Sequence, residues 1–140
     1  MYDLVPLQPV DYLIIGHIAV DITSDGLRLG GTAAYAGLTA HALGLRVGIV
    51  TSVGDEAQLQ ALGGIHIVSV PATQSTTFEN IETENGRRQI LHHRAEPILI
   101  DHIPQIWRKS SIIHLAPIAR ELDVDLSAKF PGSLIGITPQ

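Results

Sequence analysis

The sequence predicts an α/β fold built on a mostly parallel β-sheet that is flanked by helices and carries a small β-hairpin. Three observations support this prediction. Apolar residues form near-continuous runs, which are typical of strands covered on both faces in a parallel sheet. An alanine-rich segment of helical spacing separates the first two runs, as a crossover helix does. A polar, β-prone stretch in the second half has a turn signal at its centre.

Five strands and three helices are expected along the chain. The strands span residues 13–20, 46–53, 65–70, 111–116 and 134–137. The main helix is expected over residues 32–43, with Thr32 as its N-cap and Gly44 as its C-terminal stop. Two short helices are expected over residues 56–62 and 123–130, because a Gly-Gly pair and a Pro-Gly pair follow them.

The hairpin is expected from residues 76–83 and 87–93. Asn85 and Gly86 lie between these stretches and tolerate the positive φ of a type I′ turn. An inserted hairpin either covers a site or pairs with a partner, or it is a decorative excursion. The last expected strand, 134–137, has no helix after it, so one side of the sheet would lack cover. We therefore expect the domain to be incomplete at its C-terminus.

Composition excludes several classes of protein. The chain has 140 residues, 45% of them hydrophobic, which is enough for one domain with a core or a large part of one. Nine basic against 14 acidic residues argue against a nucleic-acid or membrane-surface partner. The lack of cysteine excludes disulfides and thiolate metal sites. No apolar run is long enough to span a membrane and no basic leader opens the chain, so we expect a cytoplasmic protein.

Few residues point to chemistry by themselves. Residues 26–31 have the spacing of neither a dinucleotide-binding loop nor a Walker A loop. The pair Gly30 and Gly31 allows either a close approach of the backbone to a ligand or a tight turn into the helix. Asp21, at the expected carboxyl end of the first strand, is either an acceptor for sugar hydroxyls or a turn residue. Arg87 and Arg88 form either a solvated hairpin face or a contact for an anionic substrate.

The histidines are expected to be structural. His92 and His93 are adjacent on a strand and would point to opposite faces, so no metal site is predicted. His17 and His114 lie in apolar runs, where hydrogen-bonded core histidines are expected. Trp107 is expected to anchor a helix.

Four segments, taken in order, carry a resemblance to a known family. They read Gly-His-Ile-Ala-Val-Asp at 16–21, Gly-Gly-Thr-Ala-Ala-Tyr-Ala at 30–36, Ala-Leu-Gly-Leu-Arg-Val at 42–47 and Val-Gly-Asp-Glu at 53–56. Together with the hairpin, this order resembles the N-terminal half of the ribokinase (PfkB) family of carbohydrate and nucleoside kinases, over essentially the whole chain. Within that family, the sequence looks most like the myo-inositol kinase branch.

The resemblance implies a ribokinase-like fold, with a β-hairpin lid over about residues 74–93, and ATP-dependent phosphorylation of a hydroxyl group of a sugar, polyol or nucleoside. It implies that Asp21 binds acceptor hydroxyls and that Gly30 and Gly31 contact the acceptor through their backbone. Tyr35 and Glu79 are further candidate contacts, although an exposed carboxylate at a sheet edge is the commoner case for a residue such as Glu79. The resemblance also implies a homodimer, formed through the lid or the exposed sheet.

Two departures from the family pattern bear on activity. Tyr35 stands where many sugar kinases of this family have Asn. The Gly-x-Gly-Asp element, which supplies the family's anion hole and general base, belongs to the C-terminal half and does not occur here. Asp55 follows an earlier strand and is expected to be a turn or helix N-cap residue. We therefore expect that ATP and Mg²⁺ serve the complete enzyme only and that these 140 residues transfer no phosphate. The alternative is a non-catalytic ligand-binding or oligomerisation module derived from the same fold.

Overall fold

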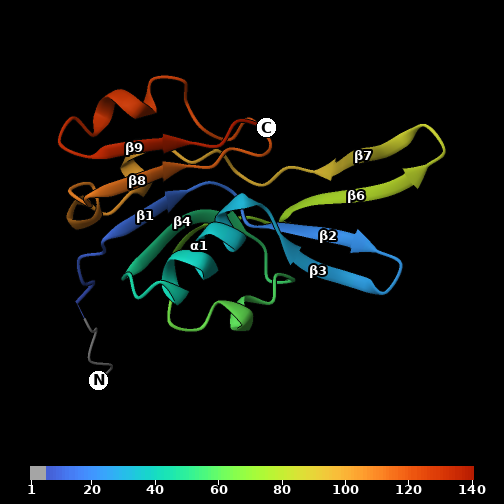
Figure 1. Cartoon of the computed structure of the whole chain (residues 1–140), viewed down its shortest axis with the longest axis horizontal. Coiled ribbons are helices and arrows are strands. Elements are labelled where there is room, and N and C mark those ends of the chain that lie inside the picture. The colour runs from blue at the N-terminus through green and yellow to red at the C-terminus, as the bar shows by residue number, and fades with distance from the viewer. Residues whose placement is uncertain (1–5) are drawn as a thin grey trace.

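Two β-sheets that meet at one corner make up the computed structural model, which describes residues 6–140 (Figure 1). The main sheet is parallel throughout, in the order β5-β4-β1-β8-β9. Its strands are β1 (Tyr12–Ile15), β4 (Val47–Val53), β5 (His66–Pro71), β8 (Ile112–Leu115) and β9 (Leu134–Ile137). The mostly parallel sheet expected from the apolar runs is confirmed.

The second sheet, called the lid sheet below, extends from the carboxyl ends of the main strands, on the right in Figure 1. Its order is β3-β2-β6-β7, with strands β2 (Ala19–Thr23), β3 (Gly26–Gly30), β6 (Thr76–Thr83) and β7 (Gly86–His93). Two antiparallel hairpins, β2-β3 and β6-β7, join through a parallel pairing of β2 with β6. The expected hairpin is therefore half of the lid sheet.

One α-helix, α1 (Thr32–Ala42), packs against the main sheet. Its buried residues are Ala33, Ala34, Gly37 and Ala40, and these small side chains let the helix axis approach the sheet closely. At Gly37, a Cβ atom would lie 2.9 Å from Cδ1 of Ile49. Gly44 follows the helix with φ of 88°, which confirms the expected stop. The expected N-cap is wrong, because Gly31 occupies that position and Thr32 is the first helical residue.

The opposite face of the main sheet is covered by two irregular segments, one before β8 and one after it. The first contains the 3₁₀ turns Ile100–His102 and Gln105–Trp107, the second contains Leu126–Lys129, and the side chains of Trp107 and Phe130 are fully buried beneath them. Trp107 thus anchors a 3₁₀ turn, and its indole N–H donates to the Gln8 carbonyl over 2.8 Å. The helices expected over 56–62 and 123–130 are wrong in type, because each segment forms only one 3₁₀ turn, the first of them over Leu59–Leu62.

The first apolar run is not one strand. The expected strand 13–20 breaks at residues 16–18, where the chain leaves the main sheet as β1 and enters the lid sheet as β2. A Cβ atom on residue 16 would lie within 2.2 Å of the Ala116 carbonyl oxygen, so only glycine allows the two chain segments to approach so closely. Burial continues through the break, since His17 and Ile18 are fully buried, and the apolar run therefore gave no sign of it.

The hairpin turn also differs from the expected type. Thr83 pairs with Gly86, so Glu84 and Asn85 are the two turn residues. Neither has positive φ, whereas Gly86 has φ of 107°, and this excludes the type I′ turn expected at Asn85-Gly86. The β2-β3 hairpin has the same arrangement: Thr23 pairs with Gly26, and Gly26 has a positive φ of 117°. In both hairpins a threonine hydroxyl donates to the carbonyl oxygen of that glycine.

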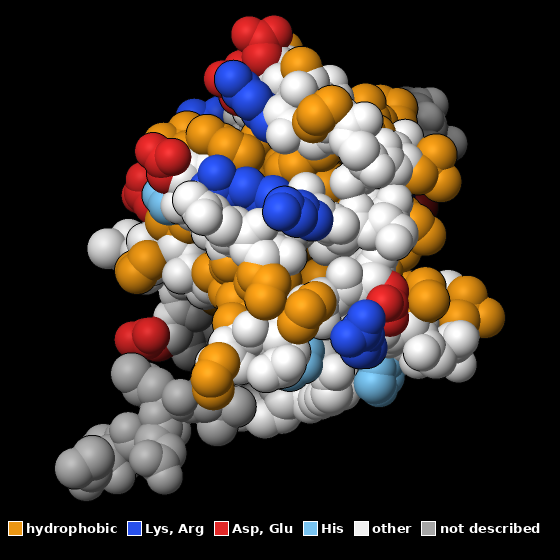
Figure 2. Space-filling model, turned by 90° about the vertical axis from the view of Figure 1, so that its left-hand side faces the viewer, with side chains coloured by type: hydrophobic (Ala, Val, Ile, Leu, Met, Phe, Trp, Pro, Cys, Tyr) orange, Lys and Arg blue, Asp and Glu red, His pale blue; other side chains and the backbone are white. Residues whose placement is uncertain are grey.

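Both edges of the main sheet are exposed rather than buried. Strand β5 has no fully buried residue, and in β9 the side chains of Leu134 and Ile137 are 70% and 58% exposed. Figure 2 shows the end of the molecule opposite the lid sheet, where hydrophobic side chains reach the surface among charged and polar ones. Within residues 6–140 no helix has the length and apolar character needed to cross a membrane.

Candidate functional site

A hollow of about 430 Å³ lies where the lid sheet meets the N-terminal turn of α1. Its volume falls within the range of about 300–1,000 Å³ found for small-molecule sites. The lid sheet and α1 supply most of its wall, and residues that follow the main strands β8 and β9 complete it. The lining residues are Asp21, Gly31, Thr32, Tyr35, Ala36, Phe78, Asn80, Arg87, Gln89, Ile118 and Gln140.

Asp21 lies in the middle of β2, not at the carboxyl end of a main strand as the sequence suggested. Its carboxylate leans over Gly30 of the neighbouring strand, where a Cβ atom would lie 2.1 Å from Asp21 Oδ2. Burial raises the pKa of Asp21, and the positive charge of Arg87 acts in the opposite direction. Within residues 6–140 no group donates a hydrogen bond to this carboxylate, so its oxygens can accept hydrogen bonds from a bound ligand.

Gly31 turns the chain from β3 into α1. Its φ of 90° is unfavourable for other residues, and a Cβ atom there would lie 2.9 Å from the His17 carbonyl oxygen. Among the residues that the structure describes, no side chain caps the helix, so the first-turn N–H groups are available at the wall formed by Gly31 and Thr32. Gly30, where a side chain would collide with Asp21, and Gly31, where it would collide with His17, are thus both required by the packing of the chain. Gly31 also contributes backbone to the hollow.

Of the other two candidate residues, Tyr35 lines the hollow and Glu79 does not. Tyr35, one turn into α1, lines the hollow with its side chain 64% exposed. Glu79 does not line the hollow: it alternates along β6 with Phe78 and Asn80, which do, so it points from the opposite face of the lid sheet. There it accepts a hydrogen bond from His92 over 2.7 Å. The structure thus brings Asp21, Gly30, Gly31 and Tyr35 together and leaves Glu79 apart.

Three further polar side chains of the lid sheet face the hollow, and of these only Arg87 was named from the sequence, as a possible contact for an anionic substrate, whereas Asn80 and Gln89 were not predicted. Asn80 Oδ1 accepts hydrogen bonds from Arg87 Nε and from Gln89 Nε2, each over 3.1 Å. The period-two alternation of β6 and β7 would have placed these residues on the face of Phe78, once the inward face of the hairpin was known. That face was not evident from a hairpin that is polar on both sides.

A buried polar network fixes the lid sheet to the main sheet. His17 Nδ1 lies 2.7 Å from the Thr76 hydroxyl oxygen, and His17 Nε2 lies 2.7 Å from the Glu96 carbonyl oxygen. A carbonyl oxygen only accepts, so Nε2 carries the proton and Nδ1 accepts from Thr76. These bonds link the three segments that run between the two sheets. The expectation that His17 is a hydrogen-bonded core residue is confirmed.

Glu121 completes this network with a buried carboxylate that forms no ion pair with any residue in the described part of the chain. Its oxygens accept hydrogen bonds from the backbone N–H groups of His17, Ile118 and Ala119, over 2.7–3.1 Å. Its residue exposure is 2%. Ile118 lines the hollow, and His17 lies in the segment that connects β1 with β2. By binding the backbone of both residues, Glu121 fixes one wall of the site against this connection.

Asp55 and His114, which were expected to be structural residues, lie outside the hollow. Asp55 lies in an exposed turn after β4, as expected from its position in the sequence. His114 Nδ1 forms a hydrogen bond with Tyr12 Oη over 2.8 Å, and His114 Nε2 forms one with Thr138 Oγ1 over 2.6 Å. Both ring nitrogens therefore have a partner. Across residues 6–140, no group of three or more His, Asp or Glu side chains lies close enough to bind a metal ion.

Comparison with known proteins connects this geometry to one fold. No family model matches the sequence. The chain is 26% identical over 141 aligned positions to a cytidine kinase of Thermococcus kodakarensis, with 91% of this chain covered. It spans about half, 51%, of the length of that curated relative.

Two solved structures are similar in fold. A pyrophosphate-dependent kinase of the ribokinase family, in complex with a pyrophosphate analogue and myo-inositol, matches with a TM-score of 0.65 and 22% identity, covering 82% of this chain and 43% of that one. The ribokinase of Arabidopsis thaliana, complexed with ribose and ATP, matches with a TM-score of 0.67 and 16% identity, covering 93% and 53%. The fold is therefore ribokinase-like, and the resemblance noted in the sequence is confirmed at this level.

Proposed function

We propose that this chain is the acceptor-binding part of a kinase that transfers a phosphoryl group to a hydroxyl of a sugar, polyol or nucleoside. The observation that carries this proposal is the Asp21 carboxylate, which receives no hydrogen bond within residues 6–140 and lies over Gly30 at a hollow of small-molecule size. A hydroxyl group donates readily to such a carboxylate. The ribokinase-like fold supports the same class of reaction as an analogy.

The roles proposed for the other residues follow from their chemistry. Gly31 and Thr32 offer backbone N–H groups to an acceptor oxygen at the start of α1. The Tyr35 phenol can donate to or accept from a hydroxyl at the mouth of the hollow. Glu79 faces the other side of the lid sheet and is not proposed as an acceptor contact in this conformation.

Phosphoryl transfer needs more than an acceptor site. The transferred group must be positioned against donors that offset its charge, and a base must reach the attacking hydroxyl. We propose that ATP and Mg²⁺ act in the complete enzyme, through residues outside this chain, since its 140 residues contain no Gly-x-Gly-Asp element. The chain by itself then binds an acceptor without phosphorylating it.

Acceptor binding can be tested by calorimetric titration of myo-inositol, D-ribose and cytidine into the 140-residue chain. Asp21→Asn should weaken the binding of whichever compound binds by at least about tenfold, because a hydrogen bond to a charged group contributes about 1.5–3 kcal/mol. The matched control is Asp25→Asn, which makes the same change at the exposed tip of the β2-β3 hairpin. Equal affinities for the two variants would contradict the role of Asp21.

The absence of transfer is tested separately. The chain is incubated with the same acceptors, Mg²⁺ and either ATP or pyrophosphate, because the two structures named above hold ATP and a pyrophosphate analogue. No phosphorylated product is expected above the rate without protein. Product formation that depends on Asp21 would show that this chain contains a phosphate-donor site and would overturn that part of the proposal.

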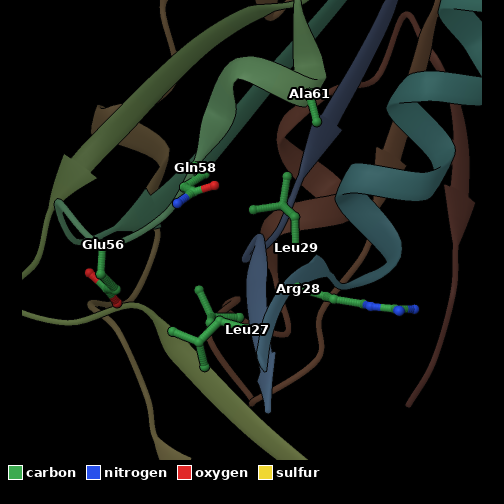
Figure 3. Close-up of a pocket in the computed structure, with 7 residues that line it drawn as sticks. Leu27, Arg28, Leu29, Glu56, Gln58 and Ala61 are labelled. Carbon is green, nitrogen blue, oxygen red and sulfur yellow. The ribbon is translucent and has the colours of Figure 1, made fainter. Parts of the chain in front are cut away.

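We also propose that the outer face of the lid sheet pairs with a second copy of the chain. Figure 3 shows Leu27 and Leu29 on this face, beside Glu56 and Gln58 of the loop that follows β4. Arg28 points away from them. Leu27 is 64% exposed, and Ile81 of the same face is 37% exposed. An exposed apolar sheet face of this kind is typical of an interaction surface.

Sedimentation velocity tests this pairing and separates the two functional readings. Leu27→Asp should convert a dimer into a monomer, whereas Val124→Asp, at a residue 90% exposed elsewhere, should not. A wild-type chain that is monomeric at high concentration would contradict the pairing. A dimer that binds none of the acceptors would favour the alternative, an oligomerisation module without a ligand site.

A further inference from the structure

The two adjacent arginines of β7 have different environments. Arg87 lines the hollow, whereas Arg88 alternates to the opposite, outer face of the lid sheet. The hollow therefore contains two charged side chains among its lining residues, the carboxylate of Asp21 and the guanidinium of Arg87. They form no ion pair within 4.0 Å, so each is available to a different part of a ligand.

The Arg87 side chain is directed by hydrogen bonds toward the base of the lid sheet. Glu82 lies directly opposite Arg87 in the antiparallel register, yet the two form no ion pair within 4.0 Å. Arg87 Nε instead donates to Asn80 Oδ1, which also receives Gln89 Nε2. Asn80 and Gln89 line the hollow themselves, so this bond draws the guanidinium toward the hollow rather than across the strand pair.

The remaining donors of Arg87 suit an anion. Its two terminal amino groups make no hydrogen bond with any residue in the described part of the chain. With Nε already engaged, these groups present parallel N–H bonds at the end of a planar fork, which matches a carboxylate or phosphate in two-point contact. Asp21 would repel such a group and attracts hydroxyls, so the two charges favour opposite ends of the same ligand.

We propose that this hollow selects a hydroxylated acceptor that carries a carboxylate or phosphate group, with the anionic group bound by Arg87 and a hydroxyl by Asp21. This inference rests on the proposed function and adds the chemical class of the acceptor to it. Asn80 and Gln89 act as positioning residues for the guanidinium.

Matched pairs of compounds test the proposal by calorimetric titration into the 140-residue chain. D-gluconate and D-glucitol share one carbon chain and differ in a carboxylate, and D-fructose 6-phosphate and D-fructose differ in a phosphate. Wild-type protein should bind one acidic member at least about tenfold more tightly than its neutral counterpart, as a charge-assisted bond implies. The pair that shows the preference distinguishes a carboxylate from a phosphate acceptor.

Variants assign the preference to one side chain. Arg87→Gln should abolish the preference for the acidic compound, since it removes the charge-assisted bond to the anionic group. Arg88→Gln, the matched control on the other face, should retain the preference. Both arginines are exposed, and thermal unfolding of each variant checks that it is folded.

Two results would overturn the inference, and they differ. Acidic and neutral compounds that bind equally, or a preference that Arg87→Gln retains, would refute the anion site but leave acceptor binding at Asp21 intact. Binding of none of the four compounds, nor of myo-inositol, D-ribose or cytidine, would refute the proposed function together with this inference.

Discussion

His17 Nδ1 and the Thr76 hydroxyl oxygen lie 2.7 Å apart. His17 belongs to the segment between β1 of the main sheet and β2 of the lid sheet, and Thr76 is the first residue of β6 in the lid sheet. Both residues are fully buried. This contact joins segments 59 positions apart in the sequence. Nδ1 accepts this bond only while it carries no proton, so this contact between the two sheets requires a neutral imidazole.

That dependence predicts a loss of stability in acid. Burial lowers the pKa of His17 and of His114 below the ordinary value of 6.5, while Glu121 and Glu96 near His17 act in the opposite direction and Arg94 reinforces the shift. The unfolded chain therefore binds protons that the folded chain does not, so stability is complete above pH 6.5 and falls as the pH drops below it. Urea unfolding between pH 7.5 and 5 measures this slope.

His17→Gln should lower the free energy of unfolding by about 2 kcal/mol at pH 7.5, because it disrupts two buried hydrogen bonds. It should also reduce the pH slope, since the variant lacks one of the two histidines that must stay neutral. His66→Gln is the control, because that side chain is exposed at the start of β5. A slope unchanged by His17→Gln would show that His17 does not titrate in unfolding.

Glu121→Gln should destabilise the chain by about 3 kcal/mol. The carboxylate accepts backbone N–H groups from three residues, and an amide would replace one accepting oxygen by a donor that faces them. Glu84→Gln, at an exposed hairpin turn, should change stability by less than about 0.5 kcal/mol. Denaturant unfolding of both variants gives the comparison, and similar values for the two would contradict the structural role of Glu121.

Gly30→Ala should impair binding more than folding. The added methyl group would overlap Asp21 Oδ2, and the Asp21 carboxylate, which is only half-buried, can rotate away. We expect affinity for D-gluconate or myo-inositol to fall at least about tenfold, with a stability loss of about 1–3 kcal/mol. At Gly132, whose Cβ position has no neighbour within 4 Å, alanine should leave both quantities unchanged. Wild-type affinity in Gly30→Ala would refute the close approach.

Gly48→Ala tests the packing of the main core. A Cβ atom there would lie 3.0–3.1 Å from three ring carbons of Trp107, which is fully buried. Overpacking should cost about 1–3 kcal/mol of stability and shift the fluorescence maximum of Trp107, the single tryptophan of the chain. Unchanged fluorescence and stability would place the indole elsewhere. Gly132→Ala again serves as the control.

Much of the main sheet could be predicted from sequence, because continuous apolar runs identify strands covered on both faces. The observed β4, β5, β8 and β9 differ from the expected ranges by one residue or less at each end. The lid sheet could be predicted only in part. The turn signal of β6 and β7 was recognised, but β2 was hidden in the same apolar run as β1, because His17 and Ile18 stay buried where the chain changes sheets.

The candidate site shows the same division. The neighbourhood of Asp21, Gly30 and Gly31 followed from the resemblance, although Asp21 belongs to the lid sheet rather than to a main strand. The separation of Glu79 from the other candidates could not be predicted, since it depends on which face of β6 turns inward. Polar residues on both faces of that strand gave no hydrophobic alternation from which its orientation could be inferred.

The parallel pairing of β2 with β6 also constrains the order of folding. Ala19 of one hairpin is in register with Thr76 of the other, so the four-stranded lid sheet cannot assemble until both segments are present. Before that, β2-β3 is an isolated two-stranded hairpin, a structure that is marginal in water. Because this pairing closes a long loop, we expect the lid sheet to form late in folding, after local contacts such as those of α1.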